Sequence, residues 1–528
     1  MLIYSDCFGI FWPVSSTLAK PAKPRWRLGT IHVGAGGVGL FVFVLYLMTL
    51  APTVLYYTST MEDAPALDAP VLPVSAYVLG IPQATGYPTY TILTHFFTYL
   101  PIGDVAYRVN LASAVFGALA VIAVFLVGLV LNGRIVATAV GALAFGTSEL
   151  FWSQAVIAEV YTLNALFVAL VVLVLLVWKE RREDKYLLAA TFLMGLSMTH
   201  HMSSGLLLPA GFLFVLLVEP RKLVEWRLLL KGVGLFFLGL VPYVFLPVRA
   251  RMDPPLNVGD PSNWERFWYV VSGAQFKGRM FVFGPEELPG RLYMYLNSLF
   301  GQFHWAIVMV GIAGAIYLLA RDRAAFALLA FLYLGWLFYA LEYNIEDVHY
   351  YFIPTYLILA VFVTVGLGAL SQEAEATTTR FSAKIRTAIL IALSLLVLAV
   401  ALWGLGETYR AVDRSGDYEG RQIIEVVDRN TEPSATIIQL RSPLYYAALV
   451  EGRRKDLKLL SYFEAQNNEE PRTKEEKDAR IDAAARDGSL YALYPDKYLH
   501  QSRRLEEAGY RLVSIEGDML YKVVPSEV

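Results

Sequence analysis

The stretch from Asp68 to Tyr90, DAPVLPVSAYVLGIPQATGYPTY, combines a single carboxylate with four prolines and two glycines. Residues 51–107 around it include no Lys or Arg. An isolated loop Asp is a candidate general base, because a carboxylate can take a proton from an incoming hydroxyl. Glu62 and Asp63 precede it, so spacing alone equally allows Asp68 to be an ordinary loop carboxylate. The side of the membrane on which this loop lies decides between these interpretations.

The residues after Asp68 predict a helix lying in a membrane interface. Pro88 suits the first turn of a helix, and the residue before it, Tyr87, is expected to be extended. From Thr89 to Tyr99 the pattern separates an apolar face from a polar face, as is typical of an interfacial helix. The apolar face holds Tyr90, Leu93, Phe96 and Phe97, and the polar face holds Thr91, Thr94, His95 and Thr98. This helix would hold Asp68 near the lipid head groups.

Other polar residues stand at the ends of apolar segments. Glu159, in QAVIAEVYTLN, is a functional candidate because an ionisable group at the membrane edge is expensive to bury, although it could equally fix helix packing. His200 and His201 are adjacent and cannot face the same way on a helix, so paired metal ligation is not expected. They could contact substrate or serve packing. Asp347 and His349 share the end of a later segment and could line the same cavity.

The composition places all of these residues in a membrane protein. The chain has 528 residues, of which 56% are hydrophobic and only 17% charged, with a mean hydropathy of +0.49. Soluble domains are nearer 25% charged. The net charge of −2 and the lack of a basic run give no sign of a nucleic-acid partner. The single cysteine, Cys7, excludes an internal disulfide, and the N-terminus lacks the basic region of a signal peptide.

Apolar runs near the 20 residues needed to cross a bilayer predict a polytopic, all-α membrane domain over residues 31–405. Basic residues cluster in alternate connections, which are expected to be cytoplasmic, as is the N-terminal segment 1–30. Residues 51–107, 150–159, 199–202, 249–291 and 342–350 then lie outside, the first and fourth as large loops. Eleven spans are expected, at 31–50, 108–131, 135–149, 160–178, 186–199, 203–219, 228–247, 296–319, 325–341, 351–370 and 387–405.

An odd number of spans puts residues 406–528 outside the cytoplasm as well. The segments ATIIQL, LKLLSY and SLYALY read as short strands, and DKYLHQSRRLEEAG reads as a helix that ends at Gly509. The charged stretch 469–486 reads as a solvated helix or a flexible insert. A small extracytoplasmic α/β domain is therefore expected, and it carries no Gly-rich phosphate loop.

Several of the outer stretches are similar to a known family. They include LGIPQATGYPTY, YRVNLASA, FWSQAVIAEVYTLNALF, GLSMTHHMSSGLLLPA, DPPLNVGDPSNWERFWYVVSGAQF and IEDVHYYFIPTYLILA. Together they resemble the protein O-mannosyltransferase-like membrane glycosyltransferases, glycosyltransferase family 117 of the GT-C superfamily. The resemblance covers most of residues 51–370 and does not extend to the C-terminal domain.

The resemblance implies a GT-C fold and transfer of a sugar from a polyprenyl-phosphate carrier to an acceptor hydroxyl on the outer face, with inversion. In that family an Asp stands eleven residues before the Leu of the LGIPHPPGYP stretch and is the expected catalytic base. Asp68 stands at that position here, with Leu79 as the Leu. Two residues depart from the family pattern, because its Glu is Val71 in this chain and its His is Gln83. Tyr87, Glu159, His200, His201, Asp347 and His349 are expected to line the substrate cavity.

Arg249 and Arg251 end an apolar span where the phosphate of a lipid-linked donor would lie. A guanidinium binds phosphate oxygens in pairs and stays charged, so both residues are expected to bind the donor phosphate, with interfacial snorkelling as the alternative role. No metal or other cofactor is then required, although a metal ion is compatible with the reaction. The expected partners are a polyprenyl-phosphate sugar, membrane lipids and an acceptor protein, lipid or glycan.

The rival hypothesis is a membrane protein without this chemistry. It would be a GT-C relative that only binds a glycolipid, which Val71 and Gln83 favour, or a lipid or solute transporter. Transporters typically contain repeated halves with broken helices near the midplane. The sequence shows no internal repeat, which argues against transport.

Overall fold

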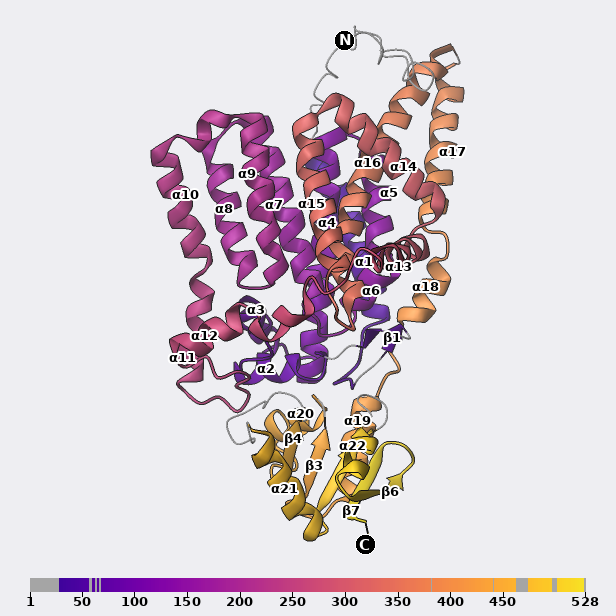
Figure 1. The fold of residues 1–528 in the computed structure, drawn as a ribbon. Coiled ribbons are helices and arrows are strands. Elements are labelled where there is room, and N and C mark those ends of the chain that lie inside the picture. The colour runs from indigo at the N-terminus through magenta and orange to yellow at the C-terminus, as the bar shows by residue number, and fades with distance from the viewer. Residues whose placement is uncertain are drawn as a thin grey trace.

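A computed structural model describes residues 28–56, 59–61, 64–65, 68–380, 382–439, 441–461, 473–495 and 501–526. Most of the chain forms a tall bundle of helices, and a smaller α/β unit packs beneath one end of it (Figure 1). Cys7, Glu62, Asp63 and most of the predicted cytoplasmic segment 1–30 lie outside the described residues.

Each of the eleven apolar segments overlaps a helix of the bundle. These helices are α1 (Leu28–Met48), α4 (Val105–Asn132), α5 (Ile135–Gly146), α7 (Tyr161–Arg181), α8 (Asp184–Met198), α9 (Leu207–Val218), α10 (Trp226–Gly239), α14 (Trp305–Arg321), α15 (Arg323–Leu341), α16 (Ile353–Thr377) and α17 (Ala383–Ala401). The prediction of a mainly helical, multi-pass membrane protein is confirmed.

The predicted number of eleven spans is confirmed only in part. Among the described residues, seven helices are long and apolar enough to cross a membrane, or up to nine if each of two bent pairs counts as one span. The helix α8 has 15 residues and the segment Met202–Val218 has 17, which is short for a bilayer core of roughly 30 Å.

The predicted span 296–319 is wrong at its beginning. Its first residues belong to a separate helix, α13 (Leu288–Gln302), which meets α14 at an angle of 108°. The break falls at His304, whose Nδ1 accepts a hydrogen bond from the Ala306 N–H and so starts a new helix. A second bend, of 70°, separates α5 from α6 (Glu149–Ala155).

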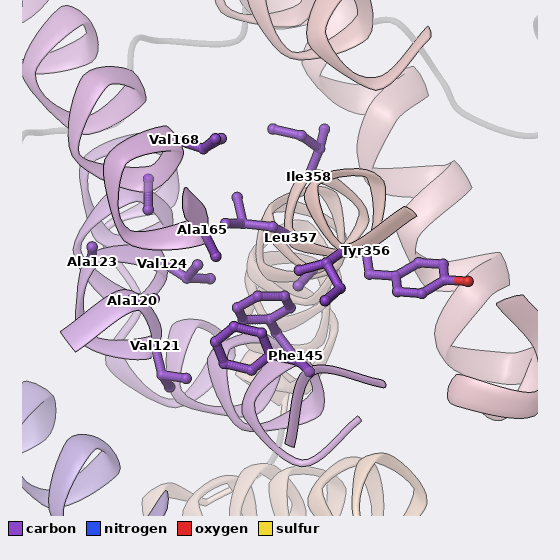
Figure 2. Packing of buried hydrophobic residues seen from close by; sticks show 14 of the residues in the cluster. Ala120, Val121, Ala123, Val124, Phe145, Ala165, Val168, Tyr356, Leu357 and Ile358 are labelled. Atoms are coloured by element: carbon purple, nitrogen blue, oxygen red, sulfur yellow. The ribbon is translucent and has the colours of Figure 1, made fainter. Parts of the chain in front are cut away.

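The helix α16 lies at the centre of the bundle. In its span, 94% of the apolar window is buried inside the protein, against 17% for the span containing α10. Figure 2 shows Leu357 and Ile358 of α16 beside small and branched residues of α4 and α7, including Val124 and Ala165, and beside the Phe145 ring of α5, while the Tyr356 side chain points away from them. The peripheral helices leave large apolar side chains exposed, as expected of surfaces that face lipid.

Four ion pairs join the connections at the end of the bundle opposite the α/β unit. The pairs are Arg134–Glu375, Lys179–Asp322, Arg182–Glu219 and Lys222–Asp184. All four connect segments that the charge pattern predicts to be cytoplasmic. The predicted alternation of the connections between two ends is therefore reproduced by the fold, whereas the side of the membrane that each end faces stays a prediction.

The other end of the bundle carries short helices and loops. They are β1 (Ser59–Met61), β2 (Ala64–Pro65), α2 (Leu72–Val78), α3 (Pro88–Phe97), η1 (Met202–Leu206), η3 (Val241–Val244), α11 (Phe245–Ala250), α12 (Trp264–Val271), η4 (Ala274–Arg279), η5 (Val348–Phe352) and α18 (Leu405–Val412). At the end with the four ion pairs, η2 (Pro220–Leu223) follows α9 and η6 (Thr378–Arg380) follows α16.

The predicted faces of the helix after Pro88 are partly wrong. In α3, Tyr90 is buried together with Thr91, Thr94 and Thr98, while Leu93 and Phe96 are exposed. The threonine hydroxyls can be buried because Thr94 and Thr98 donate to backbone carbonyls of their own helix. The apolar residues that point outward are consistent with contact to lipid.

The three predicted C-terminal strands are present as β3 (Thr436–Gln439), β4 (Lys458–Ser461) and β5 (Leu490–Leu493). The sequence analysis missed a hairpin of β6 (Tyr510–Glu516) and β7 (Leu520–Pro525), which completes the sheet in the order β4-β3-β5-β7-β6. The strand β3 pairs in parallel with β4 and β5, and β7 is antiparallel to both its neighbours. The helices are α19 (Glu419–Asn430), α20 (Leu444–Leu449), α21 (Lys474–Arg486) and α22 (Gln501–Glu507).

The α/β unit is joined to the bundle by a shared apolar cluster. Val54, Val71 and Leu256 from the bundle side pack with Ile423 and Leu444 from the unit. Polar contacts surround the cluster. Arg421 of α19 pairs with Asp104 and donates to Thr53 Oγ1 at 2.7 Å, the Ala106 N–H donates to Tyr446 Oη at 3.2 Å, and the rings of Tyr56 and Tyr494 stack at 5.5 Å.

Glycines set the closest approach in the bundle. A Cβ atom on Gly314 of α14 would stand 2.0 Å from the Phe362 carbonyl oxygen of α16, and one on Gly366 would stand 2.3 Å from the Val310 oxygen. Small residues at such positions allow helix backbones to pack directly in a membrane. A Cβ atom on Gly234 of α10, in contrast, would meet nothing within 4 Å.

We therefore expect Gly314→Ala to lower the free energy of unfolding by about 1–3 kcal/mol, because the added methyl group forces two helix backbones apart. Gly234→Ala is the matched control and should be neutral or stabilising by up to about 1 kcal/mol through helix propensity. Thermal unfolding of both variants in the same detergent measures the difference. Equal stability of the two variants would contradict this packing.

Candidate functional site

Asp68 stands at the beginning of α2. Its backbone carbonyl accepts hydrogen bonds from the N–H groups of Val71 and Leu72, both at 3.0 Å. The main chain of Asp68 therefore starts the helix, and its side chain is not needed for this role. The carboxylate is paired with the guanidinium of Arg441, and only 19% of the Asp68 side chain is exposed. Burial raises the pKa of Asp68, the Arg441 guanidinium opposes this rise, and the Gln83 amide beside the carboxylate opposes it further.

Two of the family-like stretches hold each other in place around Asp68. The Ile81 N–H donates to the Leu256 carbonyl at 2.8 Å, and the Val258 N–H donates back to the Ile81 carbonyl at 3.0 Å. Gly80 allows this close approach, since a Cβ atom there would stand 2.9 Å from the Leu256 oxygen. The LGIPQATGYP loop is thereby fixed to the DPPLNVGDP loop.

The backbone of Tyr87 differs from the prediction. An extended conformation was expected before Pro88, but Tyr87 has φ 38° and ψ 48°, which is left-handed. The left-handed region also avoids the right-handed helical conformation that proline disfavours in the preceding residue. Tyr87 follows a tight turn in which the Gly86 N–H donates to the Gln83 carbonyl at 2.8 Å. The turn brings the Tyr87 ring to 6.4 Å from the ring of His200.

Glu159 and Asp347 come from two other loops and face the same region as Asp68. Glu159 is 5% exposed, and its Oε2 accepts a hydrogen bond from the Val160 N–H at 3.2 Å. Asp347 is partly buried, and its Oδ2 accepts from Tyr161 Oη at 2.7 Å. Three carboxyl groups that are distant in sequence are therefore close enough to influence one another.

Burial dominates the pKa values of these acids. It raises the pKa of Glu159 well above its usual range, and the neighbouring carboxylates of Asp68 and Asp347 raise it further. Burial also raises the pKa of Asp347 to about 6, against the opposing effect of the Tyr161 hydrogen bond. It raises the pKa of Asp68 less completely, because the Arg441 guanidinium opposes it most strongly there. Arg441 lowers the pKa of all three acids.

His200 and His201 form the neutral part of this region. Burial lowers the pKa of His200 to about 3 and that of His201 to about 4, so both rings are uncharged near neutral pH. His200 Nε2 lies 2.8 Å from the Val160 carbonyl oxygen, and the His200 ring stacks with Tyr90 at 6.1 Å. His201 Nδ1 is 2.8 Å from Ser203 Oγ and caps the turn that follows. These contacts fit packing roles, and His200 Nδ1 is buried without a hydrogen-bond partner.

The remaining predicted site residues lie at the edge of this region. His349 is on η5, where its ring packs edge-on against Phe352 at 6.3 Å. Arg249 Nε donates to the Leu79 carbonyl at 2.9 Å, and its Nη2 donates to the Val78 carbonyl at 3.0 Å, so it holds the end of α2. Arg251 Nε donates to the Ser262 carbonyl at 3.1 Å. Phosphate binding by either arginine stays a prediction, and it would have to coexist with these contacts.

Sequence reasoning missed Arg441. It lies in the loop between β3 and α20, 373 residues after Asp68, and the only sequence signal is the RSP turn after a predicted strand. Within the described part of the chain, no three His, Cys, Asp or Glu side chains gather closely enough to ligate one metal ion. Transfer without a metal stays a prediction.

Comparison with known proteins connects this geometry to a family. Residues 68–224 match the family described as Protein O-mannosyl-transferase TMEM260 N-terminal domain. The chain is 33% identical over 237 residues to the Mus musculus Protein O-mannosyl-transferase TMEM260, covering 43% of this chain and 32% of that protein. It is 22% identical over 472 residues to the Dictyostelium discoideum Protein O-mannosyl-transferase tmem260, covering 79% and 57%. The chain thus spans about a third to just over half the length of these relatives.

Solved structures share the fold over nearly the whole chain. The crystal structure of ArnT from Cupriavidus metallidurans bound to undecaprenyl phosphate aligns with a TM-score of 0.60 at 12% identity, covering 94% of this chain and 98% of that one. The apo structure of the same protein aligns with a TM-score of 0.61 at 14% identity, covering 93% and 98%. Residues 68–224 are therefore similar to the protein O-mannosyl-transferase TMEM260 N-terminal domain, and nearly the whole chain shares the fold of ArnT.

Proposed function

We propose that the protein is a membrane glycosyltransferase that moves a sugar from a polyprenyl-phosphate carrier to an acceptor hydroxyl. The observation that carries the proposal is the convergence of Asp68, Glu159 and Asp347 in one buried region, at the end of the bundle where the family-like loops meet. The names of the relatives support sugar transfer, and the ArnT structure with bound undecaprenyl phosphate supports a lipid-linked donor. The donor sugar and the acceptor class, whether protein, lipid or glycan, stay open.

The proposed reaction is a single displacement with inversion. The Asp68 carboxylate takes the proton of the acceptor hydroxyl while the acceptor oxygen forms a bond to the anomeric carbon of the sugar. The bond between that carbon and the phosphate oxygen breaks, and its electron pair leaves with the polyprenyl phosphate. Holding both reactants in the right orientation at the membrane surface makes the bimolecular step effectively unimolecular, and this accounts for much of the rate acceleration.

Glu159 and Asp347 suit substrate contacts better than proton abstraction. A protonated carboxyl group can donate through its O–H and accept through its carbonyl oxygen, and this matches the hydroxyl groups of a sugar. Burial favours the protonated form of both residues. The uncharged rings of His200 and His201, together with Tyr87, form an aromatic cluster beside these carboxyl groups.

The two departures from the family pattern have different surroundings. Val71 is fully buried in the apolar cluster between the bundle and the α/β unit, so this chain uses that position for packing. Gln83 is 2% exposed and stays beside Asp68, where its amide can still orient the carboxylate. The replacement at Val71 is the observation that favours the alternative, a relative that binds a glycolipid without transferring the sugar.

In the proposed orientation the α/β unit and the site lie outside the cytoplasm, with the N-terminus on the cytoplasmic side. The charge pattern of the short connections supports this orientation, because the basic residues gather at the opposite end of the bundle.

We expect purified protein in nanodiscs to release free polyprenyl phosphate from at least one polyprenyl-phosphate sugar in the presence of an acceptor. Asp68→Asn should lower that release by about 100-fold to 10,000-fold, because the amide cannot take the proton. Glu286→Gln changes an exposed carboxyl group in the long loop on the same side and serves as the matched control. Native release that is unchanged in Asp68→Asn would move the base elsewhere. Binding of a donor without release would support the binding-only alternative.

Phosphate binding by Arg249 predicts a change in the donor requirement. Arg249→Ala should raise the KM for the donor by about tenfold or more, because a hydrogen bond to a charged group contributes about 1.5–3 kcal/mol. Arg108→Ala is the matched control, since Arg108 also donates to three backbone carbonyls, those of Ile102, Thr98 and Gly103. If both variants lose stability alike and neither changes the KM, Arg249 is a structural residue only.

A further inference from the structure

The α/β unit contributes a charged side chain to the proposed site. Arg441 reaches from the loop after β3 to the Asp68 carboxylate at the beginning of α2, and only 21% of the Arg441 side chain is exposed. Local hydrogen bonds fix the conformation of the loop that carries Arg441. Arg441 has a left-handed backbone with φ 44°, the Ser442 N–H donates to Gln439 Oε1 at 2.8 Å, and the Ala447 N–H donates to the Pro443 carbonyl at 3.0 Å.

The docking of the α/β unit fixes this reach. The helix α20, which follows the Arg441 loop, packs against α2, which follows Asp68. The shared apolar cluster includes Val71 and Val74 near Asp68 and Leu444 and Tyr445 near Arg441. The segments that follow Asp68 and Arg441 are therefore packed against each other through buried side chains, and this packing holds the two ends of the ion pair together.

The charges around Asp68 explain why a cation is needed there. Three buried carboxyl groups cannot all be ionised without strong mutual repulsion. Six groups from five loops and helices interact electrostatically with Asp68. These groups are Arg441, Gln83, Glu159, Asp347, Tyr87 and Tyr90. Of these groups, Arg441 alone is a cation, and it makes its direct contact with Asp68.

We propose that Arg441 is a positioning residue of the transfer site: by pairing with Asp68 it keeps that carboxylate ionised and oriented as the base, so that the site is complete only when the α/β unit is docked. The inference rests on the proposed function and deepens it by assigning a role to the C-terminal unit. Arg441 itself touches no reacting atom. It orients one carboxylate oxygen through the ion pair and leaves the other oxygen available to the acceptor hydroxyl.

The pKa directions agree with this role. Burial raises the pKa of all three acids, and the charge of Arg441 opposes this rise most strongly at Asp68, with which it is paired. With Arg441 present, the pKa of Asp68 is held below the value that burial alone would give it. Without Arg441, the pKa of Asp68 rises. On lowering the pH, Asp68 then becomes protonated, and activity is lost, at a higher pH than in the native protein.

The test is the pH dependence of polyprenyl phosphate release by the full chain in nanodiscs. Arg441→Gln should move the acidic limb of the kcat profile up by about 1 to 3 pH units, the usual effect of losing an opposite charge beside an Asp. Activity should return as the pH is raised. Arg441→Lys should give an intermediate limb, because it restores the charge without the planar fork of the guanidinium. Arg429→Gln, at an exposed arginine of α19, is the matched control and should leave the profile unchanged.

A purely structural role predicts a different result. Arg441→Gln would then lose activity and thermal stability at every pH, with the position of the acidic limb unchanged and no rescue by Arg441→Lys. That outcome, or a native profile in Arg441→Gln, would overturn the proposal.

An infrared measurement tests the ion pair without any turnover, and so separates this inference from the proposed function. In the native chain near neutral pH, Asp68→Asn should remove no protonated-carboxyl band if the pairing with Arg441 keeps Asp68 ionised. In the Arg441→Gln background the same substitution should remove one. A band that Asp68→Asn already removes from the native chain would overturn this role of Arg441. Absence of sugar release by the native chain, with these bands as expected, would count against the proposed function alone.

Discussion

The structure depends on the burial of negative charge where the helical bundle meets the α/β unit. Burying an isolated carboxylate is expensive unless it is paired or protonated. This protein uses both solutions within one region, since Asp68 is paired with Arg441 while burial favours protonated Glu159 and Asp347. Because the cation that pairs with Asp68 comes from the C-terminal unit, the charge balance of the site depends on the docking of that unit. The apolar cluster that includes Val71 and Leu444 holds the unit in this docked position.

The rest of the bundle acts as the scaffold for this region. Glu159 and Asp347 lie in short connections between helices, whereas Asp68 lies in the long segment between α1 and α4, and the central helix α16 begins shortly after Asp347. The loops around Ile81 and Val258 hydrogen-bond to each other, so the Asp68 loop is not independent of the long loop at 249–291. A site built in this way can be precise although most of its residues lie in loops.

The membrane bundle and much of its site could be predicted because they follow from local signals. Apolar runs located the eleven long apolar helices of the bundle but not the shorter helices between them, and the charge pattern separated the two ends of the bundle. The break at His304 was missed because residues on both sides of it are apolar, and only the capping hydrogen bond of His304 marks it. The β6–β7 hairpin was missed because most residues of β6 are exposed, so no buried face marks the strand. Tyr90 is buried where its ring stacks on His200, a tertiary contact that no local pattern encodes.

Arg441 could not be predicted for a different reason. An arginine after a strand of a C-terminal domain is an ordinary solvent-exposed residue until the two domains are docked, and that docking is a long-range property. Conversely, Arg249 looked like the phosphate ligand from its place at the end of a span, whereas the fold directs its Nε and Nη2 to the carbonyls of Leu79 and Val78. Both cases show that spacing identifies candidate charges, while tertiary contacts decide which charges meet.

The most direct test of the account is an experimental structure of the full protein with a bound polyprenyl-phosphate sugar. The account predicts that the anomeric carbon faces the Asp68 carboxylate across a space that fits one acceptor hydroxyl, with Arg441 still paired to Asp68 on the side away from the sugar. A donor bound elsewhere, or one whose phosphate displaces Arg441 from Asp68, would contradict it.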